Sequence, residues 1–414
     1  MKKSSIRIPH ASARPRRILF ISQVYSPSHD AISQINADLA VGLRDLGWEV
    51  HVLTNQVNYM TGERLQRHEV IDGIRVWRTP CVPLQREHPL ARTAIYGGFL
   101  VASGPATALI PKPDVAVYLS TPPLCGWSAS MLRRFGGVKT VYWAQDVYPE
   151  VAVQMGVLKN PFIRWSLFVV DRNIARGMDE IVVIGDEMGR VFEKKGVASA
   201  RITTISNWSV AAVEPVSRAR NPLLAEHGLL DKFVVQYSGN MGVVHDLTPI
   251  CEAMVKTAGI ADIHWLMIGD GRRRGEVEKA VQEHGLSNVT MLPYQPFDAL
   301  SVSLSAADAA LVSLWPAMEG LVVPSKLYGA MAAGRPILFV GSLEGEVVRI
   351  IERHECGYAA SDGDSLARAV TLLKNDAKLR RQMGENARHA YDECYARKHA
   401  VRKFDDLLTR LVCE

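Results

Sequence analysis

The chain has 414 residues, of which 48% are hydrophobic and 22% charged, and these proportions exclude a fibrous or disordered protein. Its length suits two domains of about 200 residues each. The formal net charge is +5 and is concentrated at the N-terminus, so the rest of the chain is near neutral and we expect no nucleic-acid partner. Six cysteines without a CxxC pair or zinc-ligand spacing favour free thiols in a reducing cytoplasm.

A basic tail spans residues 1–16, and no apolar segment of a secretory signal accompanies it. Such a tail is either solvated or in contact with anionic lipid headgroups, and the sequence leaves both readings open. We predict a cytoplasmic protein and, as a further expectation, peripheral contact with the inner face of the cytoplasmic membrane. The basic residues at this end, with no acidic residue among them, are Lys2, Lys3, Arg7, Arg14, Arg16 and Arg17.

Strand and helix patterns alternate from residue 17 onward. The apolar run at 17–22 predicts a buried parallel strand, residues 34–46 show the apolar spacing of a helix that ends before Gly47, and 48–54 predicts the next strand. These three elements make a βαβ unit. Further strands are expected at 114–119, 139–143, 180–184 and 202–205, with a helix at 186–195.

The longest apolar stretch, 95–110, lies within this first series. It contains Gly97, Gly98 and Gly104-Pro105 and is shorter than the roughly 20 residues that a membrane-spanning helix needs. Arg86 and Arg92 precede it. The stretch predicts either an ordinary buried helix or one that lies in the membrane interface.

A second series follows a linker at 209–230, which contains Pro215 and Pro222. Strand and helix alternation in both halves predicts an α/β protein with two doubly wound, Rossmann-like sheets that face each other across a cleft, with ligands at the carboxyl ends of the strands. We place the domains at 17–208 and 209–385, with a final helix at 386–414 that crosses back to the first domain. The elements expected in the second half are strands at 233–237, 264–268, 289–292, 309–313 and 335–340, helices at 248–258, 275–283 and 326–333, and a largely helical 364–411.

Two glycine loops directly follow strands of the second series. Tyr237-Ser-Gly-Asn-Met-Gly242 lets backbone amides approach an anion closely, although a plain turn between strand and helix has the same pattern. Ile268-Gly-Asp-Gly271 suits a nucleotide packed against backbone, but the third glycine of a dinucleotide site is missing.

The strongest motif is 322–336, which runs from a loop into a helix and ends on Gly334-Arg-Pro336. Pro324 and Ser325 are typical of a helix start. Lys326 places a positive charge at the same helix end, where the helix dipole disfavours it unless an anion such as phosphate is bound; a lysine exposed to solvent is the plainer alternative.

These motifs resemble family 4 glycosyltransferases, which have the two-domain GT-B fold, and in particular the bacterial branch that makes colanic acid, O-antigen and other cell-surface polysaccharides. The resemblance covers nearly all of the chain after the tail. It implies that the first domain binds the acceptor and the second the nucleotide sugar. The pieces that carry it are Tyr25-Ser-Pro27, 144–150, Ser206-Asn-Trp208, Ser238-Gly-Asn240, Gly269-Asp-Gly271, and Pro324-Ser-Lys-Leu-Tyr328 with Gly334-Arg-Pro336.

The chain departs from the family pattern at several positions. Many members carry two glutamates eight positions apart in the third motif, where this chain has Leu321 and Gly329, and Glu319 is a candidate substitute for the first glutamate. Asn240 and His245 stand where a basic pair is common. The resemblance therefore implies a donor site of Gly239, Asn240, Gly269, Asp270, Gly271, Tyr294, Glu319, Ser325, Lys326 and Glu346, with Tyr294 at the nucleobase and Glu346 at the ribose or sugar.

For the chemistry, we expect Lys326 and the loop at Gly239 to stabilise the leaving diphosphate, because preorganised charge usually dominates such catalysis. Asp146, which directly follows a predicted strand, is the candidate that orients or deprotonates the acceptor, with Glu150 nearby; an N-cap role for Asp146 is the alternative. The resemblance implies a retaining, metal-independent transfer without a cofactor, since the nucleotide sugar is a substrate.

The predicted activity is transfer of a sugar, of the N-acetylated hexosamine type, from a UDP-linked donor to a polyprenyl-diphosphate-linked acceptor in polysaccharide synthesis. One rival is a nucleotide-sugar epimerase of the same architecture, which shares the donor site but needs no acceptor. A nicotinamide dehydrogenase is a second rival, against which the incomplete glycine pattern counts. A third is a sugar- or lipid-binding protein that has lost turnover, which the departures at Leu321 and Gly329 keep open.

Overall fold

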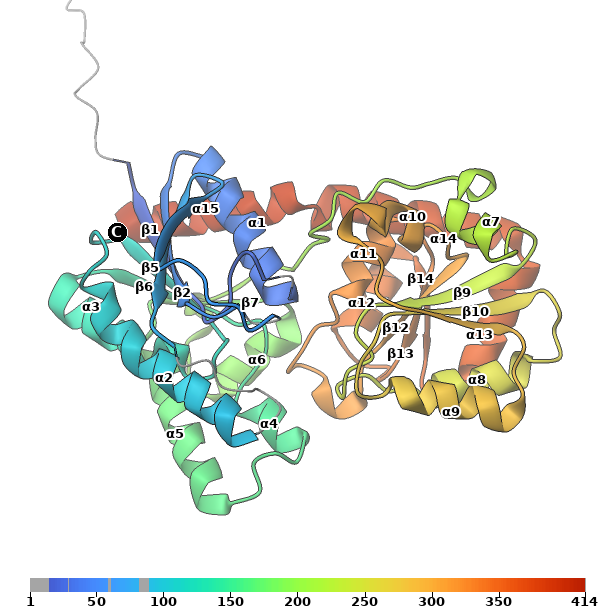
Figure 1. Ribbon diagram of the computed structural model, residues 1–414, viewed down its shortest axis with the longest axis horizontal. Helices are drawn as coiled ribbons and strands as arrows, with labels where there is room; N and C mark the ends of the chain where they lie inside the picture. Colours follow the sequence, from blue (N-terminus) through green and yellow to red (C-terminus); the bar gives the residue numbers. More distant parts are fainter. Residues whose placement is uncertain (1–14, 29, 59–60, 82–88, 414) are drawn as a thin grey trace, which may run out of the picture.

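The computed structural model describes residues 15–28, 30–58, 61–81 and 89–413. They form two α/β domains that lie side by side (Figure 1). Each domain has a mainly parallel sheet between helices, which confirms the predicted fold class of two Rossmann-like domains. Residues 1–14 of the predicted tail and Arg86 lie outside the described residues.

Among the described residues, the N-terminal sheet has eight strands in the order β3-β4-β2-β1-β5-β6-β7-β8. Neighbouring strands are parallel except β3 and β4, which form an antiparallel hairpin at one edge. The hairpin was not predicted. The strands are β1 (Arg17–Ile21), β2 (Glu49–Asn55), β3 (His68–Ile71), β4 (Ile74–Thr79), β5 (Val115–Leu119), β6 (Lys139–Trp143), β7 (Glu180–Val183) and β8 (Ile202–Thr204).

Alternate side chains of β1 enter two different cores, since successive residues of a strand point to opposite faces. Ile18 and Phe20 pack with α1, whereas Leu19 and Ile21 belong to the cluster on the other face. Both faces are therefore buried, which explains the unbroken apolar run in the sequence. The helical segments of this domain are α1 (Ala31–Asp45), α2 (Pro89–Thr107), η1 (Cys125–Ser128), α3 (Ala129–Gly136), α4 (Glu150–Gln154), α5 (Pro161–Gly177), α6 (Asp186–Lys194) and η2 (Ser199–Arg201).

The apolar stretch 95–110 lies mostly in α2. This helix buries Ile95 and Phe99 but leaves Val101 exposed, as is Leu109 just beyond its end. It is therefore a surface helix with one buried face. No helix in the described parts of the chain combines the length and the apolar character needed to cross a bilayer.

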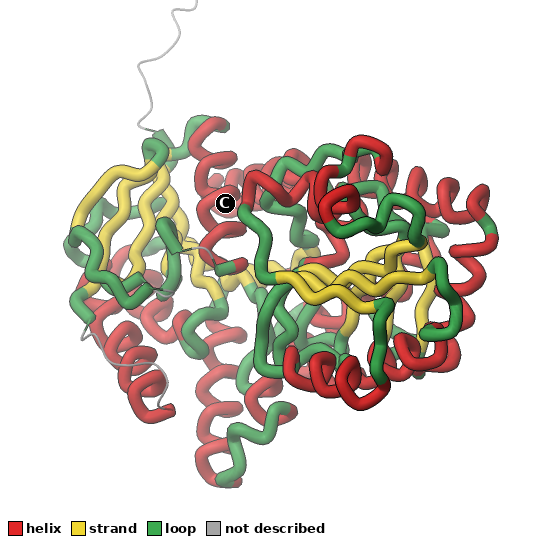
Figure 2. Tube along the Cα trace, turned by 45° about the vertical axis from the view of Figure 1, so that its right-hand side comes forward, coloured by secondary structure: helices red, strands yellow, loops and turns green. Residues whose placement is uncertain are grey.

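The C-terminal sheet, within the fully described stretch 209–413, has six parallel strands in the order β11-β10-β9-β12-β13-β14. Figure 2 shows its strands between two layers of helices. The strands are β9 (Phe233–Ser238), β10 (Ile263–Ile268), β11 (Val289–Leu292), β12 (Ala309–Ser313), β13 (Ile337–Val340) and β14 (Gly357–Ala360). The helical segments are η3 (Arg218–Arg220), α7 (Pro222–Glu226), α8 (Thr248–Thr257), α9 (Arg274–His284), η4 (Phe297–Ala299), α10 (Leu300–Leu304), η5 (Pro316–Met318), α11 (Lys326–Ala332), α12 (Glu346–His354), α13 (Gly363–Asn375) and α14 (Ala377–Ala390).

The chain returns to the N-terminal domain through α15 (Arg397–Cys413), after a π-helical turn η6 (Tyr391–Tyr395). Arg397 forms a 2.7 Å ion pair with Asp38 of α1, and the Phe404 ring lies 4.9 Å from that of Trp143 in β6. The crossing therefore begins at this turn, later in the chain than the predicted boundary at residue 386. In Figure 1, α15 lies beside α1 along the first domain.

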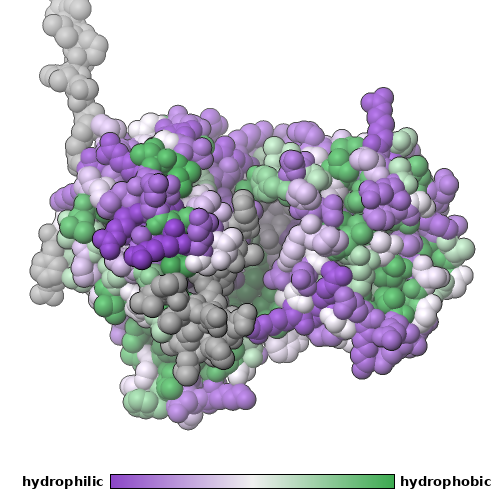
Figure 3. All heavy atoms as spheres, in the orientation of Figure 1, coloured by the Kyte–Doolittle hydropathy of each residue, from purple (hydrophilic) through white to green (hydrophobic). Residues whose placement is uncertain are grey.

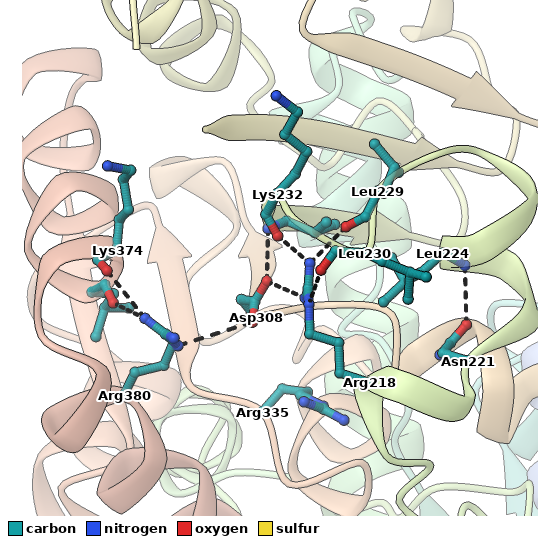
Figure 4. Close-up of polar contacts among 12 residues, drawn as sticks. Arg218, Asn221, Leu224, Leu229, Leu230, Lys232, Asp308, Arg335, Lys374 and Arg380 are labelled. Carbon is teal, nitrogen blue, oxygen red and sulfur yellow. Dashed lines mark hydrogen bonds and ion pairs between the residues drawn. The ribbon is translucent and has the colours of Figure 1, made fainter. Parts of the chain in front are cut away.

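The linker between the domains is fastened to the amino ends of β9 and β12, at the opposite end of the sheet from the expected ligand edge (Figure 4). The Arg218 guanidinium contacts the Asp308 carboxylate at 2.5 Å and donates hydrogen bonds to the carbonyls of Leu229, Leu230 and Lys232. Asp308 also accepts a 2.8 Å hydrogen bond from the Val234 amide. One arginine thus ties the linker to two strands.

Replacing Arg218 with alanine should lower the melting temperature by roughly 4–8 °C, because the Asp308 carboxylate and the carbonyls lose a charged donor. Differential scanning calorimetry of the full chain measures this change. Arg220→Ala, at an exposed position of the same turn, is the matched control and should melt within about 1 °C of the parent. Equal melting of both variants would show that the Arg218 network does not stabilise the domain.

Candidate functional site

The candidate site lies where the strand order of the C-terminal sheet reverses, between β9 and β12. Ligands of open α/β sheets bind at such switch points, beyond the carboxyl ends of the strands. The loop of Gly239 and Asn240 follows β9, and the loop of Gly269 to Gly271 follows the neighbouring strand β10. In Figure 3 the surface is hollowed between the two domains.

The two glycine loops touch each other backbone to backbone. The Gly239 amide donates to the carbonyl of Ile268 at 2.9 Å, and the Met241 amide donates to that of Asp270 at 2.7 Å. Gly269 has φ +123°, and a Cβ there would lie 2.2 Å from the Gly239 carbonyl oxygen. Position 269 thus requires glycine, both for its positive φ and because a side chain would collide with the Gly239 loop. Contact between the two loops therefore explains this glycine without a dinucleotide site.

Replacing Gly269 with alanine should weaken binding of a nucleoside diphosphate at least about tenfold, because the two loops must move apart. Isothermal titration calorimetry measures the affinity. The control is Gly275→Ala in α9, where nothing lies within 4 Å of the added methyl group. If the Gly269 variant bound nucleotide as tightly as the Gly275 variant, these loops would not form the nucleotide site.

Lys326 is the first residue of α11, and its side chain reaches back to the loop after β9. Its Nζ donates to the Asn240 carbonyl oxygen at 3.0 Å and lies 3.0 Å from Nε2 of His245. It also lies 4.9 Å from the ring centre of Tyr237. Lys326 is therefore not an exposed lysine: three neighbours fix its ammonium group beside the Gly239 loop.

His245 holds Lys326 through one defined tautomer. Its Nδ1 lies 2.6 Å from the Ser313 carbonyl oxygen. Because a carbonyl only accepts, Nδ1 carries the proton and Nε2 is left to accept from Lys326. Burial, and then the charge of Lys326, lower the pKa of His245 to about 3, so the ring stays neutral at physiological pH.

Desolvation lowers the pKa of Lys326 to about 7. The side chain as a whole is only half-buried, but its nitrogen is enclosed by Asn240, His245 and Tyr237, and this local enclosure sets the pKa. A bound diphosphate would favour the charged form. Ser325 stands at the N-cap, exposed, without a capping hydrogen bond from its side chain.

Asp146 lies at the domain boundary, next to the segment that leads into Lys326. It follows β6, and its backbone pairs with Val322, in the segment that leads into Lys326; next to it, the Val147 amide donates to the Leu321 carbonyl at 2.9 Å. Desolvation raises the pKa of Asp146 to about 6. The backbone of Asp146 therefore lies against the segment that begins at Val322 and continues into Lys326, at the boundary between the domains.

The Asp146 loop is held in place from within its own domain. The Ser120 hydroxyl accepts from the amides of Gln145 and Asp146, at 3.1 and 3.2 Å. The Gln145 side chain bonds that of Asn207 at 2.8 Å. Asn207, which is distant in sequence, therefore helps to hold the 144–150 loop in place.

Glu150 is placed differently from Asp146. Its carboxylate pairs with Lys195 at 3.0 Å, and the same buried lysine pairs with Asp171 at 2.6 Å and donates to the Tyr148 carbonyl. These contacts suit a residue that fixes α4 rather than one that meets substrate. We therefore assign Glu150 a positioning role in the proposal below.

Glu319 and Glu346 meet at the amino end of α12. The Glu346 amide donates to Oε1 of Glu319 at 3.0 Å, while Oε2 of Glu319 is buried without a partner in the described part of the chain. Desolvation raises the pKa of Glu319. The role of Glu319 as a substitute for the missing glutamate at Leu321 stays a prediction.

The Glu346 side chain crosses to the N-terminal domain. It accepts from the Asp186 amide at 3.0 Å and pairs with Arg349 at 3.0 Å, and Arg349 also pairs with Glu187 of α6. Glu346 thus links the domains beside the site, a contact that the sequence did not predict.

Tyr294 and the arginine run complete the rim of the site. The Tyr294 hydroxyl donates to the Asp270 carbonyl at 3.2 Å, which brings it to the second glycine loop. Arg274 donates to the Gly269 carbonyl at 2.7 Å, and Arg273 bonds the His245 carbonyl. The two arginines were not predicted as loop supports, although the Arg-Arg-Arg run directly after Gly271 was a visible signal.

Across the described ranges, no group of three or more His, Cys, Asp or Glu side chains is arranged to hold a metal ion. Metal independence remains a prediction for the assay below.

Comparison with known proteins assigns both domains. Residues 31–208 match the glycosyl transferase 4-like domain, and residues 223–390 match the glycosyl transferases group 1 domain. The probable glycosyltransferase WbjE of Pseudomonas aeruginosa is 31% identical over 73% of this chain and 76% of its own. The putative colanic acid biosynthesis glycosyl transferase WcaI of Escherichia coli K12 is 27% identical over 77% of this chain and 81% of its own.

Solved structures share the fold at lower identity. Sucrose-phosphate synthase from Thermosynechococcus elongatus superposes with a TM-score of 0.75 at 20% identity, covering 96% of this chain and 99% of its own. HepE from Anabaena, solved in complex with UDP and glucose, has a TM-score of 0.72 at 15% identity, covering 95% and 100%. With its domain matches and its similarity to WbjE, the chain belongs to the family 4 glycosyltransferases with the GT-B fold.

Proposed function

We propose that this glycosyltransferase retains the anomeric configuration while it moves a sugar, of the N-acetylated hexosamine type, from a UDP-linked donor to a polyprenyl-diphosphate-linked acceptor in cell-surface polysaccharide synthesis. The observation that carries the proposal is the meeting of Lys326, held by Asn240 and His245, with the Asp146 loop at one segment. A cation from one domain and a carboxylate from the other then flank the reacting bond.

On the donor side, the diphosphate lies at Lys326 and the Gly239 loop, with the nucleobase toward Tyr294. As the bond between the anomeric carbon and the phosphate oxygen breaks, negative charge grows on the diphosphate. Lys326 stabilises that charge, and since three neighbours already hold its ammonium group, little reorganisation is needed. Glu319, whose carboxylate accepts from the Glu346 amide, is the candidate for contact with a sugar hydroxyl.

On the acceptor side, the attacking hydroxyl approaches the same face that the diphosphate leaves, so the configuration is retained. Asp146 orients this hydroxyl, and the proton passes to Asp146 or to the departing phosphate oxygen. Its carboxylate acts in the ionised form, so its raised pKa of about 6 matches a base that works near neutral pH. Glu150 holds α4 through Lys195 and so fixes the loop from which Asp146 projects.

Relatives support the substrate classes. HepE was solved with UDP and glucose, and this supports the uridine nucleotide proposed for the present chain. WcaI is named for colanic acid biosynthesis, which favours a polysaccharide pathway and hence a lipid-linked acceptor. A lipid-linked acceptor also requires the enzyme to work at the inner membrane surface.

The proposal is tested by incubating the protein with a panel of nucleotide sugars, with and without lipid-linked acceptor extracted from membranes, and measuring free nucleoside diphosphate. Release from a UDP-sugar that depends on acceptor, and that continues with EDTA present, is the expected result. An isomerised donor would instead indicate an epimerase. Absence of turnover with every donor would indicate a binding protein, and loss of activity with EDTA would contradict metal independence.

A further inference from the structure

The amino-terminal part of α5 projects from the lower end of the N-terminal domain in Figure 1. Along the whole helix, only Asp171 and Ala175 are buried, and both lie in its second half. The first half reads Pro161-Phe-Ile-Arg-Trp-Ser-Leu-Phe-Val-Val170. A surface helix normally turns polar residues outward, whereas a helix that is apolar all round is suited to an apolar surrounding.

Large apolar side chains are gathered on this projection and on the loop before it. We call them the apolar tip. The Phe162 and Trp165 rings lie 6.1 Å apart, so the tip presents an aromatic pair. The apolar tip comprises Met155 at 36% exposure, Val157 at 68%, Phe162 at 72%, Ile163 at 50% and Trp165 at 62%.

The charge around the apolar tip has one sign. Lys159 and Arg164 are exposed among the apolar residues, and residues 151–170 contain no Asp or Glu. Figure 3 shows hydrophobic and hydrophilic residues together at this end of the molecule. Aromatic residues flanked by basic ones match the boundary of an anionic bilayer, where the rings enter the interface and the cations meet phosphate.

A second apolar feature lies beside the other half of α5. A groove of about 570 Å³ lies between α5 and the η1–α3 segment, and it is lined by Trp127, Val170 and Ile174 among others. Trp127 and Val170 of this groove are partly exposed, and Val101 of α2 is a further exposed apolar side chain of the same domain. A cluster of exposed apolar side chains such as the apolar tip marks a contact with a partner or a membrane.

We infer that the apolar tip, with Lys159 and Arg164, docks the enzyme on an anionic lipid bilayer. The tip leads directly from α4, which follows the Asp146 loop and contacts η5 of the other domain. Docking there therefore brings the lipid surface to the segment next to α4, which follows the Asp146 loop. The inference deepens the membrane contact in the proposed function and assigns it to α5 instead of to the tail or to the 95–110 stretch alone.

The test is co-sedimentation of the full chain with vesicles of phosphatidylcholine, alone or mixed with phosphatidylglycerol. The parent should sediment with the mixed vesicles and much less with phosphatidylcholine alone. Phe162→Ser with Trp165→Ser should weaken binding roughly tenfold or more, because the apolar area no longer enters the interface. Lys159→Glu with Arg164→Glu should weaken it several-fold, most clearly at low salt.

Matched controls lie on the C-terminal domain. Phe297→Ser replaces another half-exposed aromatic ring, and Lys378→Glu reverses another exposed charge. Both should bind mixed vesicles as the parent does. Since the replaced residues are all exposed, unchanged thermal melting checks that every variant folds.

Three results would overturn the inference. The parent could fail to bind mixed vesicles, or the tip variants could bind them as well as the parent does. The tip variants could also alter the oligomeric state in sedimentation velocity while vesicle binding stays unchanged, which would make the tip a contact between copies of the chain. The assay contains no donor or acceptor, so its failure would leave the donor-site proposal standing.

Discussion

Replacing Lys326 with methionine is expected to lower kcat/KM for sugar transfer by roughly 10²- to 10³-fold, the effect of removing one preorganised charge stabiliser from a transition state. The Nζ atom lies 3.0 Å from both the Asn240 carbonyl oxygen and the His245 ring. Methionine keeps much of the length of the side chain but offers no charge or donor to the departing diphosphate. Steady-state kinetics with the donor found in the nucleotide-sugar panel measures the loss.

Lys279→Met is the control for Lys326→Met, because Lys279 lies exposed on α9 in a surface pair with Glu283. It should keep parental kinetics. If Lys326→Met also kept kcat/KM within about threefold of the parent, the diphosphate would not lie at this lysine.

The pH dependence of donor binding follows from the same residue. Desolvation lowers the pKa of Lys326 to about 7, so the free protein carries the charge below that pH and loses it above. A bound diphosphate stabilises the charged form and raises the pKa, so binding above pH 7 takes up a proton. Donor affinity should therefore fall as pH rises above about 7, by up to tenfold per pH unit.

Replacing Asp146 with asparagine is expected to lower kcat by about 10²- to 10⁴-fold, the range typical of a lost general base or acceptor-orienting group. The backbone contacts with Ser120 and Val322 do not use the carboxylate, so the loop should keep its place. Affinity for the nucleoside diphosphate should therefore stay near that of the parent. Kinetics with saturating donor, together with calorimetric nucleotide binding, separates the two effects.

The pH profile gives Asp146 a second signature. Desolvation raises its pKa to about 6, so kcat/KM of the parent should fall as pH drops through that value and the carboxylate is protonated. The Asn variant should lack this acid limb. Asp231→Asn, at an exposed position before β9, is the control and should keep the parental kcat/KM and its decrease at low pH. If the Asp146 variant showed the same decrease at low pH, the decrease would belong to another titrating group.

Most of the fold could be predicted from the sequence because buried parallel strands are short apolar runs between helical patterns. The β3–β4 hairpin was missed although Asp72-Gly73, with φ +49° and +75°, forms a tight turn whose Asp-Gly signal was readable. Strand β14 was missed because Gly357-Tyr-Ala-Ala360 is short and weakly apolar. The 364–411 segment was predicted as largely helical, but its interruption at η6 is what turns α15 back to the first domain.

The site was predicted less completely because its key contacts join distant segments. Motifs identified Lys326, Gly239 and Asp146, yet the pairing of Asp146 with Val322 depends on how the two domains meet. Likewise, the Glu346 carboxylate accepts a hydrogen bond from the Asp186 amide of the other domain. The residues next to Glu346 in the sequence do not indicate this contact. His245 was noted only as a departure, whereas the structure shows it holding Lys326.

Whether the diphosphate binds at Lys326 is measured by calorimetric titration of the nucleoside diphosphate identified in the panel, at pH 8, in two buffers of different ionisation enthalpy. Binding to the parent should take up nearly one proton, because Lys326 is mostly neutral in the free protein at that pH. The Lys326→Met variant should bind weakly and without proton uptake. Equal affinity and equal proton uptake in parent and variant would contradict binding at Lys326.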